Sequence, residues 1–169
     1  MGSSILNYQT SRVANSNPVV LKHSSTASSS AGAAGTTTLA TYTLPGGLMG
    51  PNDGLRITVL YSCTNNANAK NAVISWGSGA NDVMYNNCAS AEGYQTVAHI
   101  FNNNATNAQK CRYRFYTTGF PYGEYNGAAN ESFAVDTTAD VAITFTAEGM
   151  TATDNLILES YTIELIRAV

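Results

Sequence analysis

The sequence predicts an all-β protein, an antiparallel β-sandwich built as an eight-stranded jelly roll and preceded by an extended N-terminal arm. Three observations lead to this fold. From Thr36 onward, apolar residues recur with a period near two, which is typical of half-buried strands. Clusters of Gly, Pro, Asn and Asp separate these runs, and none borders an amphipathic stretch long enough for a helix. We therefore expect one sandwich domain over 36–169, preceded by an arm and a Ser/Ala/Gly linker over 1–35.

The first 35 residues differ from the rest of the chain. Residues 1–23 contain a few apolar side chains, and 24–35 have the Ser/Ala/Gly composition of a linker. At about 3.3 Å per residue, an extended segment of this length could reach a neighbouring subunit. The partner-binding side chains expected in the arm are Ile5, Leu6, Tyr8, Val19, Val20 and Leu21. The alternative is that 18–22 adds an edge strand to the protein's own sheet.

The strands expected after the arm are short and mostly alternating. In "GLRITVLYS" (54–62) the residues Leu55, Ile57, Val59 and Tyr61 share one face, and "DVAITFTAE" (140–148) repeats the pattern. The full set of expected strands is 36–44, 54–62, 72–76, 94–101, 112–117, 132–136, 140–148 and 156–166. Eight such strands with polar connections favour a sandwich.

Turn-forming residues mark the ends of these strands. Gly tolerates a positive φ, Asn visits the left-handed region, and Pro presets φ near −65°, so each residue type stops a strand for a definite reason. The clusters are Pro45-Gly46-Gly47, Asn52-Asp53-Gly54, Gly77-Ser78-Gly79, Asn102-Asn103-Asn104, Gly119-Phe120-Pro121 and Gly149.

Composition excludes several classes of function. Charged residues make up 11% of the chain, against about a quarter in typical proteins, and the net charge is −3. Lysines and arginines are scattered along the sequence without a basic stripe, so we expect no nucleic-acid partner. No window approaches 18 uninterrupted apolar residues and the first residues do not resemble a secretory signal, so we expect no membrane association.

The cysteines and histidines do not predict a metal centre or a cofactor site. Cys63, Cys88 and Cys111 are odd in number and widely spaced, which favours free thiols and a reducing cytoplasm. Neither His23 nor His99 stands at ligand spacing from a cysteine, so a zinc site is rejected.

Calcium is a separate question, because Asp and Asn in sandwich loops can supply oxygen ligands. The candidates are 52–54 and 79–83, each with a single carboxylate. A tight site needs several carboxylates, so turn formation is the favoured interpretation of both.

An enzyme is not expected either. His99 is the natural starting point for an acid or base, but it lies between Val and Phe in "YQTVAHIF" (94–101), where a histidine usually has a structural role. The serines considered as nucleophiles, Ser62, Ser75 and Ser78, lack a G-x-S-x-G elbow. Nothing in the spacing of the carboxylates requires a catalytic pair; those considered are Asp82, Glu92, Glu124, Glu131 and Asp136.

The segment "YTTGFPYGEYNGAANE" (116–131) is a candidate binding loop. Phe120, Tyr122 and Tyr125 stand among Gly and Asn, where aromatic rings can lie on a sugar or insert into a protein neighbour. They could equally cover the open end of their own sandwich. Subunit contact, glycan contact and self-covering therefore all stay open.

A familial resemblance adds to this reading. The residues that carry it are Pro45-Gly46-Gly47, Met49-Gly50, Leu55-Arg56-Ile57, Thr64-Asn65, Ala67-Asn68, Lys70 and 158–162. In these positions the chain, over roughly 36–169, resembles a family of small β-sandwich virion proteins of tailed bacteriophages, which occur in tail fibres, head fibres and capsid decorations. Tyr61 stands where the family pattern usually has Trp, and Cys63 and "GPNDG" (50–54) also depart from it.

The resemblance implies a jelly-roll-like domain, often a trimer, without catalytic residues. We therefore expect a virion structural protein, assembled in the bacterial cytoplasm, that decorates the capsid as a cement or head-fibre protein. Its partners would be copies of itself and the major capsid protein or other virion subunits. The alternative is a tail-fibre tip or receptor-binding module that recognises a host glycan or protein. A non-viral carbohydrate-binding or adhesin domain ranks last, because no export signal is apparent.

Overall fold

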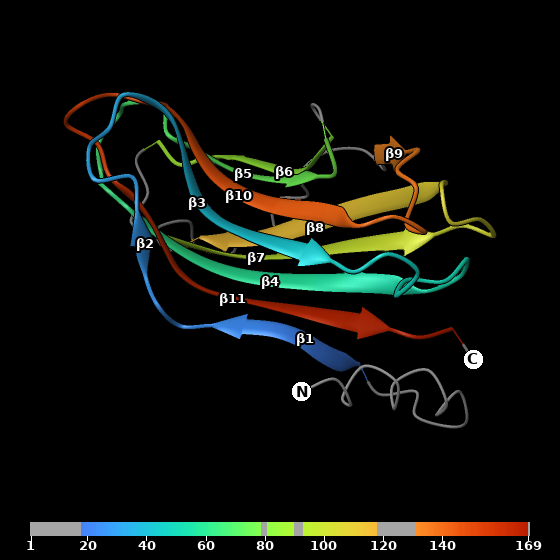
Figure 1. Ribbon diagram of the computed structural model, residues 1–169. Helices are drawn as coiled ribbons and strands as arrows, with labels where there is room; N and C mark the ends of the chain where they lie inside the picture. The colour runs from blue at the N-terminus through green and yellow to red at the C-terminus, as the bar shows by residue number, and fades with distance from the viewer. Residues whose placement is uncertain (1–17, 79–80, 90–92, 118–130, 169) are drawn as a thin grey trace.

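The computed structural model describes residues 18–78, 81–89, 93–117 and 131–168, and the regular structure in these ranges is β-strand throughout. Two antiparallel sheets lie face to face as a sandwich (Figure 1). The larger sheet has the order β1-β11-β4-β7-β8-β9, with β2 also paired to β11, and the smaller sheet has the order β3-β10-β5-β6. The prediction of an all-β sandwich is confirmed. No helix in the described part of the chain is long and apolar enough to cross a membrane.

The strands have the following bounds. In chain order they are β1 (Val19–Ser24), β2 (Ser28–Ser29), β3 (Gly35–Leu44), β4 (Gly54–Cys63), β5 (Asn71–Trp76), β6 (Asp82–Asn87), β7 (Gly93–Asn102), β8 (Gln109–Thr117), β9 (Glu131–Phe133), β10 (Val141–Met150) and β11 (Leu156–Ile166).

Eight of these strands follow the jelly-roll order. When β1, β3, β4, β5, β6, β7, β10 and β11 are numbered one to eight, the larger sheet runs 1-8-3-6 and the smaller sheet runs 2-7-4-5. Successive strands therefore alternate between sheets except at the β5–β6 hairpin, as two nested Greek keys require. The predicted topology is correct, and β8 and β9 extend the larger sheet beyond it.

Two of the eight jelly-roll strands were not among the eight predicted. The segment 79–83 was interpreted as a turn, yet β6 begins at Asp82. Alternation fails there because Val83 and Met84 are both fully buried, and the pairing register shifts between Ile74 and Ser75 of the neighbouring strand. The predicted strand over 132–136 is too long at its C-terminal end, because β9 pairs only as far as Phe133.

The other unpredicted jelly-roll strand is β1, within the segment expected to be an arm. It pairs antiparallel with β11 from Val19 to Ser24, so the edge-strand alternative describes these residues. A bulge between Val20 and Lys22 interrupts its alternation, which hides the strand from a period-two search. Strand β1 therefore belongs to the larger sheet of the sandwich.

The expected turn chemistry is present at several strand ends. Gly47, Gly77 and Gly149 have φ of 74°, 74° and 66°, in the left-handed region that favours glycine. Asn104, in the predicted Asn cluster, has φ of 58°. Gly47 lies in the connection from β3 to β4, which crosses between the sheets, whereas Gly77 and Asn104 lie in the β5–β6 and β7–β8 connections within one sheet.

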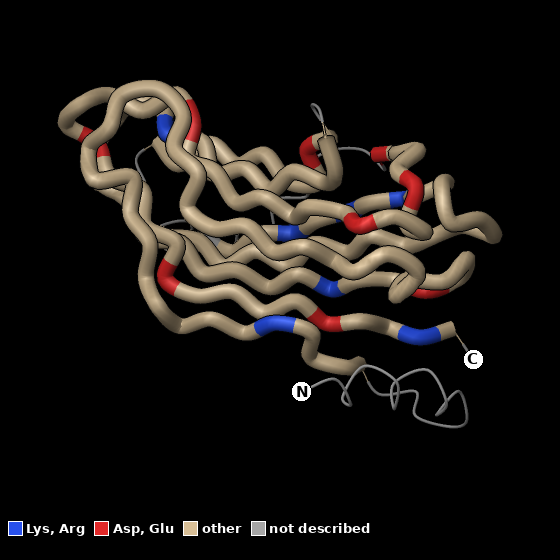
Figure 2. Tube along the Cα trace, in the orientation of Figure 1, with Lys and Arg blue, Asp and Glu red and all other residues tan. Residues whose placement is uncertain are grey.

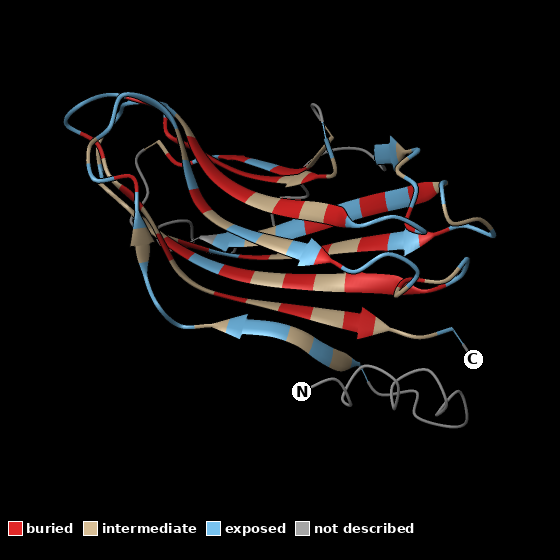
Figure 3. Cartoon of the chain, in the orientation of Figure 1, coloured by how far each residue is buried: buried red, intermediate tan, exposed pale blue. Residues whose placement is uncertain are grey.

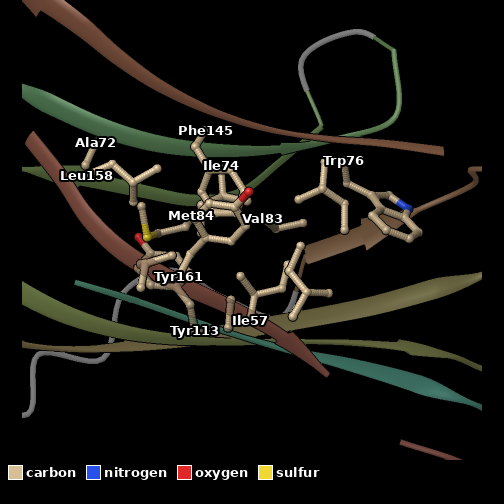
Figure 4. Packing of buried hydrophobic residues seen from close by; sticks show 14 of the residues in the cluster. Ile57, Ala72, Ile74, Trp76, Val83, Met84, Tyr113, Phe145, Leu158 and Tyr161 are labelled. Atoms are coloured by element: carbon tan, nitrogen blue, oxygen red, sulfur yellow. The ribbon is translucent and has the colours of Figure 1, made fainter. Parts of the chain in front are cut away.

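The core lies between the two sheets and is built from the alternating strands. Figure 3 shows buried residues alternating with less buried ones along β4, β7, β10 and β11. Trp76, Phe145 and Ile57 are fully buried, and Figure 4 shows side chains of both sheets meeting there. The rings of Phe145 and Tyr161 pack across the sandwich with centroids 4.6 Å apart. Burial of this apolar surface is the main stabilising contribution to the fold.

A buried polar network closes one end of the sandwich. Gln109 donates from Nε2 to Asn102 Oδ1 at 2.7 Å and to Val135 O at 2.9 Å, and its Oε1 accepts from Val135 N at 2.9 Å. Asn102 in turn donates to Thr137 Oγ1 at 3.0 Å. Because these buried groups satisfy one another, they hold the 134–137 segment against the ends of β7 and β8.

A second polar network holds the loop 64–70 between β4 and β5, which carries part of the family resemblance. Lys70 is fully buried, and its Nζ donates to Asn66 Oδ1 at 2.7 Å and to Asn68 O at 2.8 Å. The buried Asp154 accepts from Asn66 Nδ2 at 2.7 Å and from Thr151 Oγ1 at 2.5 Å. The resembling residues of this loop thus have a structural role: they fix a loop that is rich in Asn and Ala.

The Asp154 carboxylate should make the protein sensitive to acid. Hydrogen bonds from Thr151, then Asn66, lower the pKa of Asp154 to about 2. A carboxylate whose folded-state pKa is depressed stabilises the fold above its unfolded pKa of about 4 and loses that contribution as the pH falls toward 2. We expect Asp154→Asn to lower the melting temperature at pH 7 and to flatten its decline between about pH 5 and pH 2.

Thermal unfolding followed by circular dichroism over this pH range measures the effect. Glu131→Gln is the matched control, because it makes the corresponding carboxylate-to-amide change at a residue that is exposed on β9. If the melting temperature of Asp154→Asn declined with falling pH as steeply as that of the unmodified protein, Asp154 would not be the source of the acid sensitivity.

Candidate functional site

Strand β1 forms a free edge of the larger sheet. It pairs with β11 on one side, and within the described residues no strand pairs with its other side. Val19 and Leu21 are half-buried against the core, whereas Val20 is 56% exposed. An open edge offers backbone N–H and C=O groups to another chain, and it is the geometry used in β-strand addition. Of the six predicted arm residues, the structure thus assigns inward positions to two and an outward position to Val20.

The outer face of the larger sheet carries most of the exposed large apolar side chains. Five such side chains are found in the described residues, and four of them lie on this face: Val20, Leu60, Phe101 and Tyr116. The register places Leu60, Gln95 and Tyr116 in one row across β4, β7 and β8. The fifth, Tyr85, belongs to the smaller sheet. The pairing of the strands is what shows that these exposed side chains share a surface.

Phe101 has a defined position on this outer face. A Cβ atom added to Gly54 would lie 2.2 Å from Phe101 Cδ1, so the ring covers that glycine. The rings of Phe101 and His99 are stacked, with centroids 5.8 Å apart and planes 6° from parallel. The absence of a side chain at Gly54 thus lets an aromatic ring lie flat on the sheet surface, where it is 40% exposed.

Positive charges also gather on the same face. Lys110, Arg112 and Arg114 occupy alternate, outward positions of β8 and are exposed. Arg56 of β4 forms a salt bridge with Glu164 of β11, with Nε and Oε2 2.6 Å apart. Figure 2 shows the lysine and arginine positions of the larger sheet spread over β1, β4 and β8. Residues that are scattered in the sequence therefore share one surface, because alternation and pairing bring them to one face.

His99 lies among arginines rather than carboxylates. The register places it between Arg56 and Arg112 on the outer face. Burial lowers the pKa of His99, and the positive charges of Arg56 and Arg114 lower it further, which favours the neutral form of the ring. Within the described residues, no hydrogen bond joins His99 to a carboxylate. A neutral imidazole without an acidic partner is poorly arranged for the triad geometry that activates a nucleophile.

The other residues considered for chemistry have structural partners. Ser62 donates a short hydrogen bond to Glu159, and Ser75 donates to Asp82 at 2.9 Å. Asp136 accepts from the backbone N of Thr138 at 2.9 Å. Glu92 and Glu124 lie outside the described residues. These contacts join each group to its near neighbours and do not converge on a common point.

The calcium candidate at 52–54 is a turn whose carboxylate is held by hydrogen bonds within the protein. Asp53 accepts from Gly50 N at 2.9 Å, from Arg167 at 2.7 Å and from Ala168 N at 2.9 Å. Although burial raises the pKa of Asp53, these hydrogen bonds and the Arg167 charge lower it overall. The carboxylate therefore anchors the end of the chain. Among the described residues, no group of three His, Cys, Asp or Glu side chains could hold a metal ion.

Several predicted binding residues lie outside the described residues. They are Ile5, Leu6 and Tyr8 of the arm and Phe120, Tyr122 and Tyr125 of the 116–131 segment. Their roles stay predictions. Within the described ranges, the candidate site is the free edge of β1 together with the outer face of the larger sheet, which we call the docking face.

Comparison with known proteins identifies no family. No family model matches the sequence. No curated protein matches it either. Among solved structures, the chain is similar to peanut lectin with a bound peptide, with 10% identity, 79% of this chain and 81% of that chain covered, and a TM-score of 0.40.

Two further solved structures are similar at the same level. A lectin from Bauhinia forficata in complex with GalNAc has 10% identity, 77% and 78% of the two chains covered, and a TM-score of 0.36. The CBM2 module of the evolved Dit of Lactobacillus casei BL23 phage J-1 has 8% identity, 76% and 70% covered, and a TM-score of 0.34. Similarities this small carry no argument about ligands, and the fold assignment rests on the strand order itself.

Proposed function

We propose that this protein is a bacteriophage virion structural protein that decorates the capsid, as a cement or head-fibre protein, and acts by surface burial. The observation that carries the proposal is the free edge of β1, where Val20 is 56% exposed next to an apolar-containing N-terminal segment. The resemblance of the loop 64–70 and of 158–162 to phage virion modules supports the same role.

The docking face suits attachment to a shell subunit. The β1 edge can add to a strand of a neighbour, while Leu60 of β4 and Tyr116 of β8 offer apolar area farther along the outer face of the same sheet. At about 25 cal/mol per Å² of buried apolar surface, a small footprint gives weak attachment of one copy. Repetition over a symmetric lattice, as a homo-oligomer such as a trimer, strengthens attachment without new contacts.

The N-terminal segment should be required for attachment. We expect deletion of residues 1–17 to abolish binding to shells of the parent phage prepared without this protein, and to leave the melting temperature unchanged. The deletion must stop at residue 17 because Val19 and Leu21 belong to the sandwich and pack on its core. Cosedimentation with the shells measures binding, and circular dichroism measures folding.

Single substitutions on the docking face complete this test. Val20→Lys and Leu60→Lys should each weaken shell binding at least about tenfold, because a charge would be buried at the interface. Tyr85→Ser is the matched control, since Tyr85 is 49% exposed on the smaller sheet. A deletion of 1–17 that still decorates shells would refute attachment through the arm. Binding of the isolated protein to host cells, with no binding to shells, would instead favour the receptor-binding alternative.

A further inference from the structure

Two cysteines from opposite sheets meet at one end of the sandwich. Cys63 is the last residue of β4 in the larger sheet, and Cys88 directly follows β6 in the smaller sheet. Cys63 Sγ donates to Cys88 O at 3.9 Å, so the Cys63 thiol is in contact with residue Cys88. Neither cysteine forms a disulfide in the structure. The contact places two thiol-bearing residues of opposite sheets side by side, as a disulfide between them requires.

We propose that Cys63 and Cys88 are a modification site that forms a cross-sheet disulfide when the protein meets a thiol oxidant such as oxidised glutathione. Hydrogen bonds hold the backbone near both cysteines in place. The backbone N of Cys88 donates to Lys70 O at 2.6 Å, and the buried Lys70 anchors the loop that follows Cys63. The pair is therefore positioned by the fold rather than by chance approach of flexible segments.

The two thiols differ in access and acidity. Cys63 is partly exposed, whereas Cys88 is buried. The hydrogen bond with Cys88 and the positive charge of Lys70 lower the pKa of Cys63, although burial opposes them. The hydrogen bond with Cys63, burial and the charge of Cys63 raise the pKa of Cys88. Since the thiolate is the nucleophile, Cys63 attacks first and Cys88 completes the bond.

The exchange proceeds in two balanced steps. The Cys63 thiolate attacks one sulfur of oxidised glutathione, which forms a mixed disulfide and releases one glutathione thiolate. Cys88 then loses its proton and attacks the Cys63 sulfur, which releases the second glutathione thiolate. The two cysteines are oxidised to one disulfide, and oxidised glutathione is reduced to two thiols. Capping of Cys63 removes the negative charge that raises the pKa of Cys88, so the second step becomes easier than in the free dithiol.

The third cysteine is a matched control. Cys111 lies in β8, and its thiol donates to Val83 O at 3.5 Å. It is 3% exposed, and burial, followed by the charge of Glu131, raises its pKa to about 12. It is therefore far less reactive than Cys63.

The disulfide would join the two sheets covalently across 25 positions of sequence. Closing a loop of this length removes conformational freedom from the unfolded chain, and we expect the melting temperature to rise by about 5–10 °C. The inference does not depend on the virion role. If that role holds, the bond would form on release from the reducing cytoplasm, after assembly.

The test uses the full chain, incubated with oxidised glutathione or with dithiothreitol. We expect intact mass spectrometry to show the loss of two hydrogens after oxidation, and peptide mapping without reduction to link Cys63 to Cys88. The oxidised protein should melt at the higher temperature, and the gain should disappear on reduction. Cys111→Ala should retain both the mass change and the gain, whereas Cys63→Ala should lose both.

Three results would overturn the proposal. They are stable glutathione adducts on Cys63 without a link to Cys88, a link that involves Cys111, and unchanged free thiols after prolonged oxidation. Because the unmodified protein gives the decisive peptide map, the test does not depend on the folding of any variant.

Discussion

Replacing Lys70 with methionine should lower the free energy of unfolding by about 3 kcal/mol, a large part of the 5–15 kcal/mol typical of a folded domain. Methionine fills a similar volume, so the expected cost comes from the groups left behind. Lys70 Nζ donates to Asn66 Oδ1, to Asn68 O and, at 3.4 Å, to Asn66 O. In the variant these acceptors lose the ammonium donor in a site from which water is excluded, since Lys70 is 0% exposed, and Asn66 Oδ1 keeps only its bond from Asn68 N at 3.0 Å.

Lys110→Met provides the comparison. Lys110 is exposed on β8 and donates to Ser132 at 2.7 Å at the surface, so its loss should cost less than about 0.5 kcal/mol. Urea unfolding followed by fluorescence of Trp76 measures both variants. A cost below about 1 kcal/mol for Lys70→Met would show that water or a rearranged loop satisfies the carbonyl groups.

Replacing Gln109 with leucine should also lower the free energy of unfolding by about 3 kcal/mol. The Gln109 amide makes four hydrogen bonds, three from Nε2 and one to Oε1, and the side chain is 1% exposed. Leucine would leave Asn102 Oδ1 and the backbone N of Val135 without these partners. Buried networks of this kind are costly when partly satisfied, because each orphaned group bears its full desolvation cost.

Gln95→Leu is the matched control, because Gln95 is exposed on the docking face. The same substitution there should change the free energy of unfolding by less than about 0.5 kcal/mol. Hydrogen exchange adds a local measurement: in Gln109→Leu, the amide of Val135 should lose protection more than the amides of β11. Equal stabilities of the two leucine variants would contradict a structural role for the network.

Local patterns were sufficient for the strands that line the core. In β4, the alternation of Leu55, Ile57, Val59 and Tyr61 predicted the buried face correctly, because the side-chain period of a strand depends only on its backbone. Turn residues such as Asn104 were likewise predictable, since their φ preference is intrinsic.

The alternation of apolar residues did not predict strands in which the pairing with a neighbouring strand is irregular. In β6, the adjacent residues Val83 and Met84 are both buried, and a register shift in β5 accompanies them. In β1, a bulge interrupts the alternation, and the sequence left an arm and an edge strand as alternatives for 18–22. Both segments needed the neighbouring strand to define which residues face inward.

The sequence by itself determined that this is a β-sandwich with a neutral, polar surface, because composition and alternation are local properties of the chain. Only the tertiary structure decided that Val20, Leu60, Phe101 and Tyr116 share the outer face of the larger sheet, that Lys70 is buried, and that Cys63 meets Cys88. These juxtapositions join residues that are distant in sequence, and strand order and register set them.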